Sequence, residues 1–180
     1  MDVLPALGET AIGEDALLPN VEGLKGPFGC LNRARYGIAW GVMGSAEFCL
    51  HAARQYGLDR KQFGKPIASF QALQFKLADM ATELVAARQM VRLAASKLDA
   101  GARDATTYCA MAKRFATDAG FTVVNEALQL HGGYGYIREY PLERLLRDAR
   151  VHQILEGTNE IMRVIIARRM LDGDAPEAIR

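Results

Sequence analysis

Apolar residues recur every three or four positions along most of this chain, which is the spacing that places them on one face of an α-helix. This pattern predicts a first helix from about Gly29 to about Gly57. A second helix is predicted from Ser69, a plausible N-cap, to Gly101. Its apolar spacing alternates between four and three residues, as in the seam of a helical bundle. The residues of this seam are Leu73, Leu77, Met80, Leu84, Ala87, Val91, Ala94 and Leu98.

A third long helix is predicted after Asp104, whose side chain is suited to cap it. This helix ends at the glycines that follow His131. Its apolar stripe comprises Cys109, Ala112, Ala116, Ala119, Val123, Ala127 and Leu130.

Two more helices are predicted in the last third of the chain. Pro141 suits the first turn of a short helix that runs to about Arg150, and a final helix runs from after Gly157 to about Leu171. The residues of the final helix expected to face inward are Ile161, Val164 and Ile165. With three long helices and a shorter one joined by short turns, the chain is predicted to be all-α and to form an antiparallel four-helix bundle.

The segment from Met1 to Pro27 has a different character. It holds three of the six prolines and four glycines, and no helical period continues through it. We expect a short irregular arm here. The bundle is then predicted to span residues 28–171, with residues 172–180 as a tail.

Composition and charge exclude several classes of function. The 180 residues hold 22 basic and 21 acidic side chains, for a formal net charge of +1, which argues against nucleic acid or an anionic membrane as a partner. No apolar run approaches the roughly 20 residues that span a bilayer. Cys30, Cys49 and Cys109 are odd in number and unclustered, which fits a reducing compartment and gives no zinc site. A soluble intracellular domain without a metal is therefore expected.

Three segments carry side chains suited to chemistry, and the first runs from Arg60 to Pro66. Its cations, amide and aromatic ring lie on one loop between two helices, and such a set suits a phosphate and a stacked base. The alternative is a solvated basic turn.

The second segment runs from Gln129 to Tyr136 and is rich in glycine. Glycines allow a backbone to approach a ligand closely and to offer N–H groups to its oxygens. The segment follows a helix rather than a strand, so it is not a dinucleotide fingerprint of the strand-to-helix kind. The alternative is a glycine helix stop, with His131 in a structural role.

The third segment runs from Val151 to Glu160, where Glu156 follows two apolar residues at a predicted helix start. Apolar neighbours raise the pKa of a carboxylate and make it a better base, whereas the positive end of a helix dipole lowers that pKa. The alternative is a glutamate that only stabilises its helix. All three segments lie at helix ends, so the bundle could gather them at one rim or present them to a neighbouring subunit.

At these segments the chain resembles the C-terminal helical domain of the flavin-dependent acyl-CoA dehydrogenases, from about Phe28 to Leu171. Residues 60–64 are similar to the family's R-x-x-F-G loop, and residues 129–135 are similar to its Q-x-x-G-G-x-G loop. Further matches in order and spacing are Tyr140-Pro141, Arg147-Asp148 and Glu156-Gly157-Thr158.

The acyl group is not fixed by this resemblance. Residues 29–41 are most similar to glutaryl-CoA dehydrogenase, whereas residues 77–82 and 150–157 are more similar to isobutyryl-CoA dehydrogenase.

The reaction that the resemblance implies is the α,β-dehydrogenation of a short or branched acyl-CoA thioester to a 2-enoyl-CoA. Glu156 would take the α-proton, and the β-hydrogen would leave as hydride to FAD.

The resemblance also assigns binding residues. Those implied to hold FAD, partly across a dimer interface, are Arg60, Phe63, Phe70, Gln71, Gln129, Leu130, His131, Gly132 and Gly133, together with the turn residues Thr158, Asn159 and Glu160. Those implied to lie near the CoA chain are Asn32, Arg35 and Arg168. The implied partners are the acyl-CoA substrate, an electron-transfer flavoprotein and further copies in a homodimer or homotetramer. The implied compartment is the bacterial cytoplasm or the mitochondrial matrix.

The family's full chain places an N-terminal helical domain and a β-domain before this bundle. Here Gly13 to Pro19 resemble only the end of the β-domain, so residues 1–27 are interpreted as its remnant. The chain alone is therefore expected to be inactive. The alternative is a non-catalytic helical oligomerisation module derived from the family.

Overall fold

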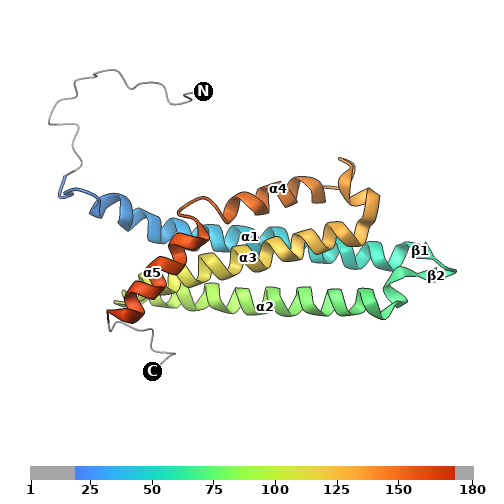
Figure 1. Cartoon of the computed structure of the whole chain (residues 1–180), viewed down its shortest axis with the longest axis horizontal. Coiled ribbons are helices and arrows are strands. Elements are labelled where there is room, and N and C mark those ends of the chain that lie inside the picture. Colours follow the sequence, from blue (N-terminus) through green and yellow to red (C-terminus); the bar gives the residue numbers. More distant parts are fainter. Residues whose placement is uncertain (1–18, 173–180) are drawn as a thin grey trace, which may run out of the picture.

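The computed structural model describes residues 19–172, so the predictions for most of the arm and for the tail after residue 172 lie outside the described residues. Within this range, three long helices lie side by side: α1 (Lys25–Asp59), α2 (Gln71–Asp99) and α3 (Ala105–His131) (Figure 1). The shorter α4 (Leu142–His152) packs against α1 and α3, and α5 (Asn159–Leu171) crosses one end of α3. The predicted all-α fold with an antiparallel four-helix bundle is confirmed.

The predicted apolar stripes form the core, and α3 lies at its centre in contact with the other four helices. The buried residues of α2 are Met80, Leu84, Ala87, Val91 and Ala94, all members of the predicted seam. The predicted stripe of α3 is buried at Cys109, Ala112, Ala116, Ala119, Val123 and Ala127. Most of these α3 residues are alanine, so neighbouring helices pack closely against it. None of the helices within residues 19–172 combines the length and apolar character that a bilayer span requires.

Several predicted helix ends differ from the structure. Helix α1 begins at Lys25, before the predicted start, because Pro27 falls in its first turn, where proline is tolerated. Ser69 is not an N-cap: it lies in the 3₁₀ turn η2 (Ile67–Ser69), and its Oγ donates to the Pro66 carbonyl at 2.7 Å. Asp104 does occupy the N-cap position of α3, but its carboxylate pairs with Lys97 instead of capping the helix.

Helix α5 buries a different face from the predicted one. Ile161 and Val164 are 47% and 41% exposed, whereas Asn159 and Met162 are buried. The reason is that α5 crosses α3 at one end of the bundle, so only the residues that meet α3 are covered.

A β-hairpin, which the sequence pattern did not predict, joins α1 to η2. Its strands β1 (Lys61–Gln62) and β2 (Lys65–Pro66) are antiparallel, with Gln62 opposite Lys65. Phe63 and Gly64 form the two-residue turn, and both have positive φ angles, of 54° and 78°. A two-residue hairpin turn with positive φ at both positions matches the right-handed twist of the strands.

Candidate functional site

The hairpin and the glycine-rich turn meet at one end of the bundle. The turn is the 3₁₀ helix η3 (Gly132–Tyr136), which directly follows α3. The Arg60 guanidinium lies 5.5 Å from the centre of the Tyr134 ring, which joins the two segments. A cavity of about 500 Å³ lies between them. It is lined by Tyr56, Arg60, Gln62, Ile67, Gln129, Leu130, His131, Gly132, Gly133, Tyr134 and Ile137.

The wall of this cavity suits an anionic ligand. Gly132 has φ +58°, and a Cβ added at Gly132 or Gly133 would meet nothing within 4 Å, so their backbone borders open space. Arg60 supplies a cation, while Gln62 and Gln129 supply amides. A guanidinium beside side-chain amides is an arrangement that binds phosphate, whereas the Gly132 N–H already donates to the Gln129 carbonyl.

Four aromatic side chains support this wall. The Tyr56 ring stacks on the His131 imidazole at 4.3 Å, and Tyr140 and Tyr134 pack edge-on or tilted around them. His131 is 3% exposed, and its Nδ1 lies 2.8 Å from the Ala127 carbonyl oxygen. Burial raises the pKa of the Tyr56 hydroxyl. Tyr56 was not predicted as a site residue. It lies in the last turn of α1, one helical turn before Arg60.

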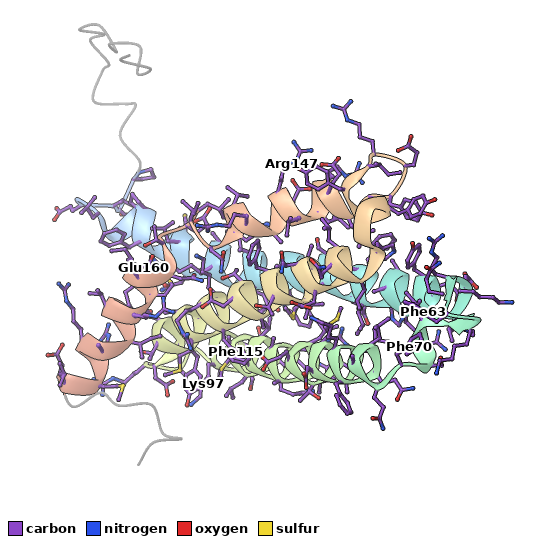
Figure 2. All side chains as sticks on the ribbon, turned by 45° about the vertical axis from the view of Figure 1, so that its right-hand side comes forward. Phe63, Phe70, Lys97, Phe115, Arg147 and Glu160 are labelled. Atoms are coloured by element: carbon purple, nitrogen blue, oxygen red, sulfur yellow. The ribbon has the colours of Figure 1, made fainter. Side chains whose placement is uncertain are left out.

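At the hairpin, the predicted residues are mostly exposed. Phe63 is 92% exposed at the tip, and its ring packs edge-on against Phe70 with ring centres 6.1 Å apart (Figure 2). The Lys65 Nζ lies 4.3 Å from the centre of the Phe70 ring. Gln71 begins α2 and is exposed.

The third predicted segment forms the connection between α4 and α5, residues 153–158, which we name the Glu156 turn. Glu156 has φ +58° and Gly157 has φ +90°. Helix α5 begins at Asn159, in agreement with the predicted start after Gly157, so Glu156 lies outside its first turn. Thr158 is the N-cap, and its Oγ1 accepts a hydrogen bond from the Ile161 N–H at 3.4 Å. Among residues 19–172, the Glu156 carboxylate has no hydrogen-bond or ion-pair partner.

Glu160 interacts with the start of α5. Glu160 lies in the first turn of α5 and is exposed. A hydrogen bond with its own backbone N–H, and then one with the Thr158 side chain, lower the pKa of its carboxyl.

The residues expected near CoA divide between two places. Arg35 is 8% exposed, and its Nε donates to the Glu156 carbonyl oxygen at 3.2 Å. Its Nη1 donates to Asn32 Oδ1 at 3.3 Å, and Asn32 Nδ2 donates to Thr106 Oγ1 at 2.9 Å. Burial lowers the pKa of Arg35. Arg168 lies apart from these residues, exposed in the last turn of α5.

A buried polar network that the sequence did not reveal lies beneath the Glu156 turn. Lys113 on α3 is 0% exposed, and its Nζ donates to the Gly157 carbonyl at 2.9 Å and to Asn159 Oδ1 at 2.8 Å. Asn159 Nδ2 donates in turn to Thr117 Oγ1 at 2.9 Å and to Asp118 Oδ1 at 2.8 Å. The Asn159 side chain therefore faces α3, unlike that of Glu160. No cluster of three or more metal-ligating side chains occurs in the part of the chain that the structure describes.

The three predicted segments do not meet at one rim. The first two meet at the hairpin end, while the Glu156 turn packs on Lys113 (Figure 1). Along α3, Lys113 and His131 are separated by about 27 Å at 1.5 Å per residue. Figure 2 shows Phe63 and Glu160 at opposite ends of the molecule.

The free energy of unfolding is expected to rise between about pH 8 and pH 10.5 because of Lys113. Burial lowers the pKa of Lys113 to about 8 from 10.5, although the Asp118 carboxylate acts in the opposite direction. The charges of Arg35, Glu160 and Glu156 act on it more weakly. In this pH range the unfolded chain binds more protons at Lys113 than the folded chain does, and stability then rises with pH.

Urea unfolding at about pH 7.5 and about pH 10 measures this rise. The Lys113→Met variant has no titrating group at this position, so its unfolding free energy should rise less. Equal pH dependence in the wild-type chain and the variant would contradict the expectation.

Comparison with known proteins agrees with this architecture. The family model "Acyl-CoA dehydrogenase, C-terminal domain" matches residues 22–171. The mitochondrial isobutyryl-CoA dehydrogenase of Bos taurus is 52% identical over 141 residues, which cover 78% of this chain and 34% of that protein.

Solved structures show the same fold. A chain in the structure of the electron transferring flavoprotein of Acidaminococcus fermentans has a TM-score of 0.81 and 45% identity, covering 83% of this chain and 39% of that one. A glutaryl-CoA dehydrogenase in complex with glutaryl-CoA has a TM-score of 0.77 and 42% identity, covering 81% and 37%. The chain thus spans little more than a third of the length of these relatives. It belongs to the acyl-CoA dehydrogenase family, as a match to the family's C-terminal domain.

Proposed function

We propose that this chain supplies the catalytic base and part of the FAD site of an acyl-CoA dehydrogenase that acts on a short or branched acyl-CoA thioester. The observation that carries the proposal is the Glu156 turn. Its backbone is held by hydrogen bonds from buried Arg35 and Lys113, while the carboxylate of Glu156 has no partner among residues 19–172. A fixed backbone with an available carboxylate is what a general base requires.

The reaction places strict demands on alignment. An α C–H beside a thioester is very weakly acidic, so its removal needs a base held at the reacting atom. Glu156 takes the α-proton, and the β-hydrogen leaves with its electron pair, which gives the 2-enoyl-CoA. FAD, when bound, supplies the acceptor for that hydride.

The cavity at the hairpin end fits an FAD phosphate group. Arg60 offers the charge, Gln129 offers an amide, and Gly132 and Gly133 have no Cβ to fill the space beside them. The other residues assigned to FAD are Phe63, Phe70, Gln71, Leu130 and His131 at the same end, Thr158 in the Glu156 turn, and Asn159 and Glu160 in the first turn of α5.

The separation of the two ends supports an oligomer. Because about 27 Å of α3 lies between them, the hairpin end binds part of the FAD of a neighbouring subunit in a homodimer or homotetramer.

An electron-transfer flavoprotein is the proposed electron acceptor, and the relationship to the chain from the Acidaminococcus fermentans structure supports this choice. The bacterial cytoplasm or the mitochondrial matrix is the proposed compartment, in line with the mitochondrial relative.

A chimera tests this function. Residues 22–171 replace the matching segment of bovine isobutyryl-CoA dehydrogenase, which supplies the remaining two thirds of the enzyme. The purified chimera is expected to show a flavin absorption spectrum that bleaches when isobutyryl-CoA is added, while the 180-residue chain alone stays colourless. A folded chimera that binds FAD but is not bleached by isobutyryl-, butyryl- or glutaryl-CoA would favour the non-catalytic oligomerisation module instead.

A further inference from the structure

The backbone of the Glu156 turn is held in an unfavourable conformation. The left-handed region at φ +58° is disfavoured for a residue with a Cβ, because the Cβ crowds the neighbouring carbonyl oxygen. Such conformations persist only when surrounding contacts fix them. The contacts around Glu156 should therefore explain how the turn is held.

Two buried cations hold consecutive carbonyl groups of this turn. Arg35, from α1, donates to the Glu156 carbonyl at 3.2 Å. Lys113, from α3, donates to the Gly157 carbonyl at 2.9 Å. These contacts fix the peptide groups on the C-terminal side of Glu156 and Gly157 against two different helices, which restricts rotation of the backbone at Glu156.

The Asp118 carboxylate binds residues at both ends of the Glu156 turn. Its Oδ1 accepts from Gln153 Nε2 at 2.7 Å and from Asn159 Nδ2 at 2.8 Å. Asn159 Oδ1 accepts from Lys113 at 2.8 Å, and the Asn159 N–H donates to the Gln153 carbonyl at 3.0 Å. The amide of Asn159 thus links the Lys113 ammonium to the Asp118 carboxylate.

Lys113 is an unusual side chain for its position. It is completely buried next to the apolar stripe of α3, and an ammonium group without water is unfavourable unless it is well paired. An apolar residue such as methionine would fill the same volume without that cost. Within residues 19–172, both acceptors of the Lys113 ammonium belong to residues 157–159: the Gly157 carbonyl at the end of the Glu156 turn and Asn159 Oδ1 just after it.

We propose that Lys113 is a positioning residue that keeps Glu156 in its left-handed conformation and so aims its carboxylate at the substrate. This inference rests on the proposed function for the role of Glu156, whereas the conformational part stands on the geometry alone. Lys113 acts through the Gly157 carbonyl and does not itself touch the substrate.

Nuclear magnetic resonance of the 180-residue chain tests the conformational part. A left-handed residue gives a strong nuclear Overhauser effect between its own amide and α protons, and wild-type Glu156 should show it. Lys113→Met is expected to remove this signal from Glu156 while the signals of α1, α2 and α3 persist. The matched control is Lys76→Met, which breaks the surface ion pair with Glu126 and should leave Glu156 unchanged. A left-handed Glu156 in folded Lys113→Met would overturn the proposal.

A second variant covers the case in which Lys113→Met does not fold. Lys113→Gln keeps a polar group beside Asn159 but is too short to reach the Gly157 carbonyl, and the same loss at Glu156 is expected. Retention of the left-handed signal in this variant would equally overturn the proposal.

The chimera tests the catalytic part separately. Lys113→Met should lower kcat by about 10²-fold, the effect of a misplaced catalytic group, with KM and flavin content unchanged. An unchanged kcat would overturn the positioning role. If the unmodified chimera itself were inactive, the proposed function would fail, and the resonance measurement would still decide whether Lys113 fixes the turn.

Discussion

In the chimera, Glu156→Gln is expected to slow exchange of the α-proton of bound acyl-CoA by about 10²–10⁴-fold, the range that a general base contributes. Glutamine has nearly the same shape as glutamate, but its amide does not accept a proton at neutral pH. The backbone contacts from Arg35 and Lys113 involve carbonyl groups, so they persist in the variant. FAD should therefore remain bound while exchange is lost.

Exchange is measured by incorporation of deuterium from D₂O into the acyl-CoA, and flavin content by absorption. The matched control is Glu143→Gln on α4, which removes a half-buried glutamate paired with Arg147. This control should exchange at the wild-type rate. Undiminished exchange in Glu156→Gln, with FAD bound, would remove Glu156 from the mechanism.

The second large effect is on stability, at Gly135 in the glycine-rich turn. Gly135 is buried, and a Cβ at this position would lie 2.6 Å from the Leu128 carbonyl oxygen, a backbone atom that cannot move without disturbing α3. It would also lie 3.1 Å from His131 Cβ. Gly135→Ala is therefore expected to lower the free energy of unfolding by about 2 kcal/mol, as overpacking of a tight site does.

Gly133→Ala is the matched control, since a Cβ there meets nothing within 4 Å. Its free energy of unfolding should stay within about 0.5 kcal/mol of the wild type, as for ordinary surface changes. Urea unfolding followed by circular dichroism compares the two. Equal stability of both variants would mean that η3 relaxes away from α3 without cost.

Much of the fold follows directly from the spacing of apolar residues. The middle of the predicted seam of α2, from Met80 to Ala94, is buried because α2 packs against both α1 and α3. Helix α5 has an equally apolar sequence, but the pattern does not indicate which side meets a neighbour. Ile161 and Val164 are exposed for that reason, while Met162 is buried.

The parts of the candidate site made by residues close in sequence could be predicted from the sequence. Contacts between residues far apart in the sequence could not. The loop from Arg60 and the glycine-rich turn were each found from local composition, and their contact through Tyr134 required the fold. Lys113 was missed because lysine is ordinarily a surface residue. A signal was present, however: Lys113 stands one turn after Cys109 and one turn before Thr117, at the edge of the buried stripe.

The length of α3 between Lys113 and His131 has a consequence for how the chain tolerates insertions. Because α3 is continuous and packed on four helices, one inserted residue would rotate everything after it by about 100° and shift it by about 1.5 Å. The hairpin end and the Glu156 turn would then lose their relative orientation, and an α3 residue would leave the core. Insertions and deletions should therefore be tolerated in the connections between helices, while the length of α3 sets the distance between the two ends.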